Sequence, residues 1–92
     1  MIKRLVKMTF KPESVNDFKE LFESKRSQIA AVKGCTHLEL LNDVNNPCVF
    51  FTYSIWENTE HIENYRQSEL FNSVWEKTKV LFNDKPEAWS LQ

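Results

Sequence analysis

The chain has 92 residues, which is enough for one domain over residues 1–92 and leaves no room for a second. Thirteen acidic residues balance twelve basic ones, for a formal charge of -1, and the basic residues form no cluster or stripe, so nucleic-acid binding is not expected. No apolar run approaches the roughly 20 residues of a membrane span and the N-terminus lacks the features of a signal peptide, so we expect a cytoplasmic protein with no membrane partner.

The N-terminal segment is expected to form a strand over residues 2–10. From Val6 onward its apolar side chains alternate with polar ones, so that Val6, Met8 and Phe10 share one face. The sequence "KPES" then interrupts the alternation and predicts that the strand has ended.

A helix is expected to begin near Ser14, which fits a capping box with Asp17 three residues later. Apolar residues between Val15 and Val32 recur at helical spacing, with charged residues mostly on the opposite side. Gly34 is the only glycine, and it stands where the C-terminal cap of a helix needs a positive φ. These signals together predict one long helix between Ser14 and Gly34.

Two strands are expected next, because "CTHLELLNDV" and "CVFFTYSIW" flank "NDVNNP", a turn built from Asn, Asp and Pro. The second strand carries apolar or aromatic side chains on both faces, so both of its sides need a cover. Its cysteine and that of the first strand, Cys48 and Cys35, would lie roughly 23 Å apart in such a hairpin. A disulfide needs Cα atoms within about 7 Å, so we expect free thiols, as in a reducing compartment.

The rest of the chain predicts a broken helix and a last strand. Asn58 or Thr59 can cap a short helix that carries Tyr65, and Ser68 can cap a second helix. The sequence "EAWSLQ" then reads as a short strand. The apolar stripe of the second helix comprises Phe71, Val74, Trp75, Thr78, Leu81 and Phe82.

The expected order is β-α-β-β-α-β, which is the ferredoxin-like α+β arrangement: a four-stranded antiparallel sheet with helices on one face. In the last strand Trp89 and Leu91 share a face. The second face of the sheet would be left open, and the central strand is apolar on that side too. We therefore expect an isologous homodimer that forms through the sheet faces.

A central segment resembles the antibiotic biosynthesis monooxygenase (ABM)-like family of dimeric α+β barrels. The segment is "KGCTHLELLNDVNNPCVFFTYSIWENTEHIENYRQSELF", with a Gly-Cys pair at a helix end, an Asp-x-x-x-Pro turn, a strand ending in Tyr-x-x-Trp-Glu, and Ser-x-x-Phe opening a helix. The resemblance implies the dimeric barrel fold. It also implies that some members oxygenate electron-rich aromatic substrates such as quinols and anthrones without metal or flavin, whereas another branch degrades haem and many relatives have no known activity.

The haem-degrading branch resembles this chain at Trp56 and differs at two further positions. Where that branch has a histidine ligand, this chain has Trp75, whose indole only donates a hydrogen bond and cannot ligate iron. Where that branch has an Asn on its first strand, this chain has an apolar residue, at about Val6. Many relatives also carry histidines where this chain has Tyr65 and Leu70. We therefore expect no haem, no metal site and no bound cofactor, and the acid–base roles of the relatives do not transfer directly.

The candidate catalytic residues are His37, His61 and Tyr65, because cofactor-free oxygenation needs a base, a donor to the developing oxyanion and a dry pocket. His37 shares a strand face with Glu39, which could orient it as a base; the alternative is a solvated or interfacial pair. His61 and Tyr65 are four residues apart on the short helix. They line a pocket if that helix face turns inward, and otherwise lie on the surface.

The candidate pocket residues are Trp56, Phe71 and Trp75, since aromatic walls suit a flat ring. Trp56 ends a central strand and is either such a wall or a core residue with its N–H bonded nearby. Phe71 and Trp75 lie on the helix stripe and belong to the core or to the same wall.

Two functions are expected as the main alternatives, and other chemistries on the same fold, such as isomerisation or small-ring rearrangement, stay open. The first is a cofactor-independent monooxygenase acting on an electron-rich aromatic substrate of the quinol or anthrone type. The second is a non-catalytic dimeric module that binds a small aromatic or apolar molecule or serves in a stress response, which the absent histidines at Tyr65 and Leu70 favour. A pocket filled solid by Trp56, Tyr65 and Trp75 would exclude both.

Overall fold

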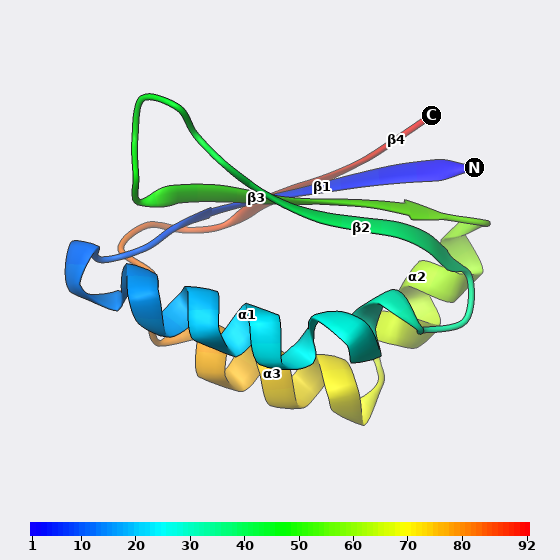
Figure 1. Ribbon diagram of the computed structural model, residues 1–92. Coiled ribbons are helices and arrows are strands. Elements are labelled where there is room, and N and C mark those ends of the chain that lie inside the picture. Colours follow the sequence, from blue (N-terminus) through cyan, green and yellow to red (C-terminus); the bar gives the residue numbers. More distant parts are fainter.

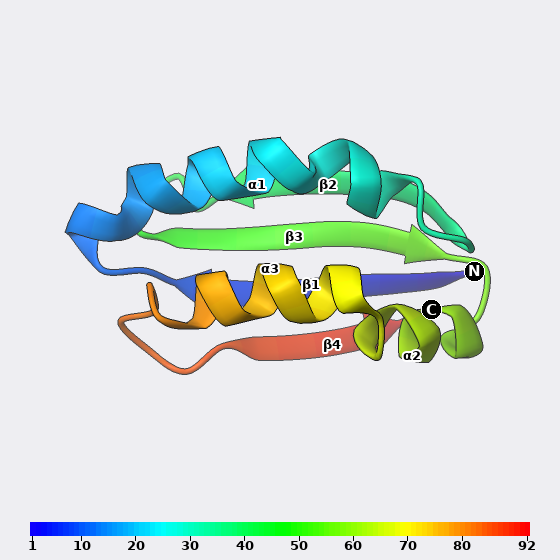
Figure 2. The ribbon, with the colours of Figure 1, turned by 90° about the horizontal axis from the view of Figure 1, so that it is seen from below.

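The four strands pair into one antiparallel sheet in the order β2-β3-β1-β4. The computed structural model describes residues 1–92. All three helices cover one face of the sheet (Figures 1 and 2), which is the ferredoxin-like α+β fold expected from the sequence. The elements are β1 (Ile2–Thr9), the 3-10 turn η1 (Pro12–Ser14), α1 (Val15–Ala30), β2 (Cys35–Asn42), β3 (Val49–Trp56), α2 (Thr59–Arg66), α3 (Glu69–Lys79) and β4 (Glu87–Leu91).

The start of α1 differs from the prediction. Ser14 ends the 3-10 turn with a φ of -102° and a ψ of -4°, and its side chain makes no capping hydrogen bond. The predicted capping box is therefore wrong, because a capping side chain reaches the first N–H groups from an extended backbone, not from a helical one. α1 ends at Ala30 with Ala31 as its C-cap, so the prediction that Gly34 caps the helix is wrong. Gly34 lies in the connection to β2, with the expected positive φ of 92°.

The two caps predicted for the broken helix are confirmed. The Asn58 side chain accepts a hydrogen bond from the His61 N–H at 3.0 Å, and Ser68 Oγ accepts one from the Phe71 N–H at 3.1 Å. α2 and α3 are therefore separate helices with a turn between them. None of the helices is long and apolar enough to cross a membrane.

The main core lies between α1 and the C-terminal half of β1. Phe10 is fully buried, and its ring stacks on Phe18 with centroids 4.1 Å apart. Burial of one such side chain stabilises a fold by about 1.5–3 kcal/mol. The buried cluster consists of Met8, Phe10, Phe18, Phe22 and Phe50.

The second face of the sheet carries no helix (Figure 1), and we call it the open face. The register places Leu5 between Tyr53 of β3 and Trp89 of β4, so these three side chains share this face. Its large apolar side chains remain partly exposed: Leu41 by 42%, Trp89 by 40% and Leu91 by 47%. The open face also carries Phe51 and Ile55, by the same alternation.

The two cysteines lie at opposite ends of the β2–β3 hairpin. Cys35 pairs with Trp56 at the end of β3, whereas Cys48 directly precedes Val49 at its start. Both thiols are free, as expected.

Candidate functional site

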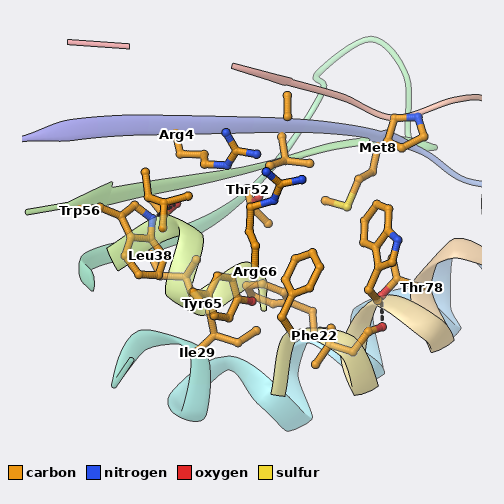
Figure 3. A pocket seen from close by; sticks show the side chains of 18 of the residues that line it. Arg4, Met8, Phe22, Ile29, Leu38, Thr52, Trp56, Tyr65, Arg66 and Thr78 are labelled. Atoms are coloured by element: carbon orange, nitrogen blue, oxygen red, sulfur yellow. Dashed lines mark hydrogen bonds between the residues drawn. The ribbon is translucent and has the colours of Figure 1, made fainter. Parts of the chain in front are cut away.

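A cavity of about 350 Å³ lies between the sheet and the helices (Figure 3). Ligand-binding cavities have typically about 300–1,000 Å³, and one water takes up roughly 30 Å³. The space is therefore large enough for a small ring system. Of its 20 lining residues 13 are hydrophobic, so the cavity favours an apolar ligand. The aromatic side chains do not fill it solid.

Four aromatic side chains form a continuous wall of the cavity, which we call the aromatic wall. Trp56 comes from β3, Tyr65 from α2, and Phe71 and Trp75 from α3. The rings follow one another with centroids 5.3, 5.2 and 5.8 Å apart, in stacked, edge-on and stacked contact. The structure thus brings together the pocket residues that the sequence suggested.

Trp56 combines the two roles that the sequence left open. The side chain is only 2% exposed, and its indole N–H donates a hydrogen bond to Ser54 Oγ at 2.9 Å. Trp56 also lines the cavity and stacks on Tyr65. Because Ser54 already accepts the indole N–H, Trp56 offers a ligand its ring surface and no free donor.

Tyr65 is the one expected catalytic residue that lines the cavity. Burial raises the pKa of Tyr65 to about 12, and the nearby Cys35 thiol adds to the effect. The hydroxyl is therefore protonated at neutral pH. Tyr65 can donate a hydrogen bond to an oxyanion, but it cannot serve there as a base.

Two arginines that the sequence analysis did not select also line the cavity. Arg4 extends from β1 and Arg66 from the end of α2, and Figure 3 shows both guanidinium groups inside the cavity between Trp56 and Met8. Arg4 Nη1 donates a hydrogen bond to Ser90 Oγ at 2.9 Å. The sequence held a signal for Arg4, because the alternation of β1 extended back from Met8 puts residue 4 on the helix-covered face.

His37 lies on the open face, away from the cavity. Its Nε2 is 2.6 Å from Glu39 Oε2, and its ring contacts Tyr53 edge-on with centroids 5.8 Å apart. The pairing with Glu39 is the one that the strand alternation suggested. The sheet separates this pair from the cavity of its own chain.

His61 is not among the cavity-lining residues. Its Nε2 is 3.7 Å from Glu57 Oε1, and its ring packs directly against the backbone of Gly34. α2 therefore turns Tyr65 toward the cavity and His61 toward the α1–β2 connection.

The ionisable groups in the lining are few: Arg4, Tyr65, Arg66 and Glu87. Glu87 Oε1 lies 4.0 Å from Lys7 Nζ. No group of three or more His, Cys, Asp or Glu side chains is close enough together to hold a metal ion. The site can bind a flat ring on its aromatic wall, donate a hydrogen bond from Tyr65 and place positive charge beside the ligand.

The same fold occurs in many solved structures. A crystal structure of an antibiotic biosynthesis monooxygenase superposes with a TM-score of 0.93 at 15% identity, over 100% of this chain and 97% of that one. A conserved protein from Methanosarcina mazei Go1 superposes with a TM-score of 0.94 at 19% sequence identity, over 99% of this chain and 90% of that one. A candidate antibiotic biosynthesis monooxygenase from Bordetella bronchiseptica superposes with a TM-score of 0.89 at 20% sequence identity, over 99% of this chain and 94% of that one. At such identities these likenesses show a shared fold.

Sequence comparison assigns the family. No curated protein matches the chain closely enough to count as a relative. The family model described as "Antibiotic biosynthesis monooxygenase" matches residues 1–77, most of the chain. As the motifs around Trp56 implied, the chain belongs to the antibiotic biosynthesis monooxygenase family.

Proposed function

We propose that the protein is a cofactor-independent monooxygenase that acts on an electron-rich aromatic substrate of the quinol or anthrone type. The observation that carries the proposal is the apolar cavity with its aromatic wall, found in a chain of the antibiotic biosynthesis monooxygenase family. The rings of Trp56 and Trp75 bound the two ends of that wall and suit a flat, fused-ring substrate.

In the proposed reaction the deprotonated substrate supplies the electrons that reduce O₂. An anthrone-type substrate loses both hydrogens of its central CH₂ group. One oxygen atom of O₂ becomes the new carbonyl oxygen, and the other leaves as water with those two hydrogens. The protein's part is to exclude water and to favour the anionic form of the substrate.

Tyr65 is proposed as the donor to the substrate oxyanion, because it lines the cavity and its hydroxyl is protonated. The histidines proposed as bases, His37 and His61, lie outside that lining. We infer that deprotonation depends on stabilisation of the anion and not on a histidine of the same chain.

We also propose that two copies associate through their open faces. The partly exposed Leu41, Trp89 and Leu91 support this, since a chain this small gains stability by covering such side chains. A closed dimer would pair the same face of both copies. It would leave each cavity under its own helices.

Oxygen consumption tests the proposed reaction. Purified protein at micromolar concentration is mixed with a panel of hydroquinones and anthrones, and O₂ uptake is followed with an electrode against each compound's spontaneous oxidation. We expect enzyme-dependent uptake with at least one compound, and loss of most of it in Tyr65→Phe. Absence of uptake with the whole panel would refute the monooxygenase proposal.

A second candidate function is a non-catalytic module that binds a small apolar molecule or acts in a stress response. The absence of histidine from the cavity lining favours it. It predicts thermal stabilisation without turnover, of about 2.7 kcal/mol at a ligand concentration one hundred times Kd. The O₂ measurement separates it from the first proposal.

A further inference from the structure

The apolar cavity holds two positive charges whose presence needs an explanation. Arg4 is half-buried, and burial lowers its pKa, with the charge of Arg66 lowering it further and that of Glu63 opposing this. The Arg66 side chain is 50% exposed, so the cost of burial falls on Arg4, which forms no ion pair. A half-buried charge beside a like charge costs free energy unless an anion accompanies it. Such an arrangement marks candidate binding sites for charged ligands.

The carboxylates near this pair do not fully balance it. Glu63 Oε1 is 3.3 Å from Arg66 Nη1, and Glu63 is largely exposed. Glu87, the only acidic residue in the lining, pairs in register with Lys7, and its carboxylate lies 4.0 Å from Lys7 Nζ on the open face. Arg4 hydrogen-bonds only to a neutral hydroxyl, that of Ser90, and the charge of Glu63 acts on it without an ion pair. The region therefore keeps positive charge available to an incoming anion.

Both guanidinium groups also retain free donors. Arg4 uses Nη1 for Ser90 Oγ, and Arg66 uses Nη1 for Glu63. A guanidinium carries several N–H donors in a planar fork that matches the two oxygens of a carboxylate. Arginine is the residue that binds such anions most specifically.

We propose that the cavity binds a planar aromatic acid, with its ring on the aromatic wall and its ionised carboxylate between Arg4 and Arg66. The inference rests on the proposed function for the site, and it narrows the substrate class from electron-rich aromatic compounds to those that carry a carboxylate. The apolar lining provides the affinity for the ring, and the two arginines select ligands that carry a negative charge.

Isothermal titration calorimetry with 2-naphthoate and its neutral isostere 2-naphthamide tests the proposal on the unmodified protein. We expect the acid to bind at least about tenfold more tightly than the amide, because a hydrogen bond to a charged group is worth more than a neutral one. Inorganic phosphate alone is included, and we expect no binding at the concentrations at which naphthoate saturates.

Substitutions then identify the groups responsible. Arg4→Gln and Arg66→Gln are each expected to weaken naphthoate binding roughly tenfold to a hundredfold, and to change naphthamide binding by less than about threefold. The matched control is Arg26→Gln, the chain's third arginine, which pairs with Glu23 at 2.7 Å, lies over the Phe22 ring and does not line the cavity. Circular dichroism melting curves check that every variant is folded.

Equal affinity for the acid and the amide, or binding of neither, would overturn the proposal. So would a loss in Arg26→Gln as large as that in Arg4→Gln, or phosphate binding as tight as naphthoate. The measurement needs no turnover. A preference for the acid without O₂ uptake on any quinol would refute the monooxygenase proposal and support the carboxylate site. O₂ uptake without a preference for the acid would support the monooxygenase proposal and refute the carboxylate site.

Discussion

Gly34 is predicted to tolerate no side chain. It has a φ of 92°, and a Cβ built on it would overlap the His61 ring. Gly34→Ala therefore introduces two penalties, one in the backbone and one in the packing between the α1–β2 connection and α2. The same contact explains why His61 turns away from the cavity.

The two penalties can be estimated separately. A left-handed backbone costs a non-glycine residue about 1–2 kcal/mol. An extra methyl group in a packed site costs typically about 1–3 kcal/mol. The expected total of about 2–5 kcal/mol is a large share of the roughly 5–15 kcal/mol that stabilise a small domain. For a chain of this length, Tm should fall by roughly 8 °C or more.

A double-mutant cycle distinguishes the two penalties. In Gly34→Ala with His61→Ala the ring is absent, so the packing penalty should vanish and the backbone penalty remain. Urea denaturation followed by circular dichroism should give a coupling free energy of about 1–3 kcal/mol. A Gly34→Ala variant within about 0.5 kcal/mol of the parent protein, or a coupling near zero, would refute the reasoning. His61→Ala alone should keep the O₂ uptake, since His61 does not line the cavity.

Three further predictions concern Tyr65 and the open face. Tyr65→Phe should lower kcat/KM roughly a hundredfold by removing the oxyanion donor, measured as O₂ uptake. The native Tyr65 pKa of about 12 lies above the unfolded value near 10. Native protein therefore holds the proton longer, and the free energy of unfolding should fall between about pH 10 and 12 more steeply in the parent protein than in Tyr65→Phe; equal slopes would contradict this. Trp89→Glu should convert a dimer to monomers in analytical ultracentrifugation, whereas Val80→Glu, an exposed apolar control at 63% exposure in the chain segment after α3, should not; a parent protein that is already monomeric would refute the dimer.

Much of the fold could be predicted because its signals are local. The alternation in β1 and the capping residues Asn58 and Ser68 each act within a few positions of the chain. Ser14 shows the limit of such signals. Its sequence context matches a capping box, but the preceding 3-10 turn sets its backbone to helical angles, which the spacing of residues does not reveal.

The site was predictable where apolar periodicity determines the lining. Phe71 and Trp75 belong to the apolar stripe of α3, and Trp56 lies on the face of β3 that the helices cover. The arginines were missed because a charged side chain is usually solvated, and only the three-dimensional arrangement shows that Arg4 enters the cavity. The position of His61 depends on a contact with Gly34, far away in sequence, which no local pattern contains.

The turn between α2 and α3 explains why a cavity with an aromatic wall exists at all. In one continuous helix, successive residues rotate by about 100°, so the side chains at positions 65 and 71 would point roughly 120° apart around the helix axis and their rings would not meet. In the structure α2 ends at Arg66, and Ser68 caps α3: its Oγ donates to the Tyr65 carbonyl at 2.6 Å and accepts from the Phe71 N–H at 3.1 Å. The turn changes the direction of α3, and the Tyr65 and Phe71 rings meet edge-on with centroids 5.2 Å apart.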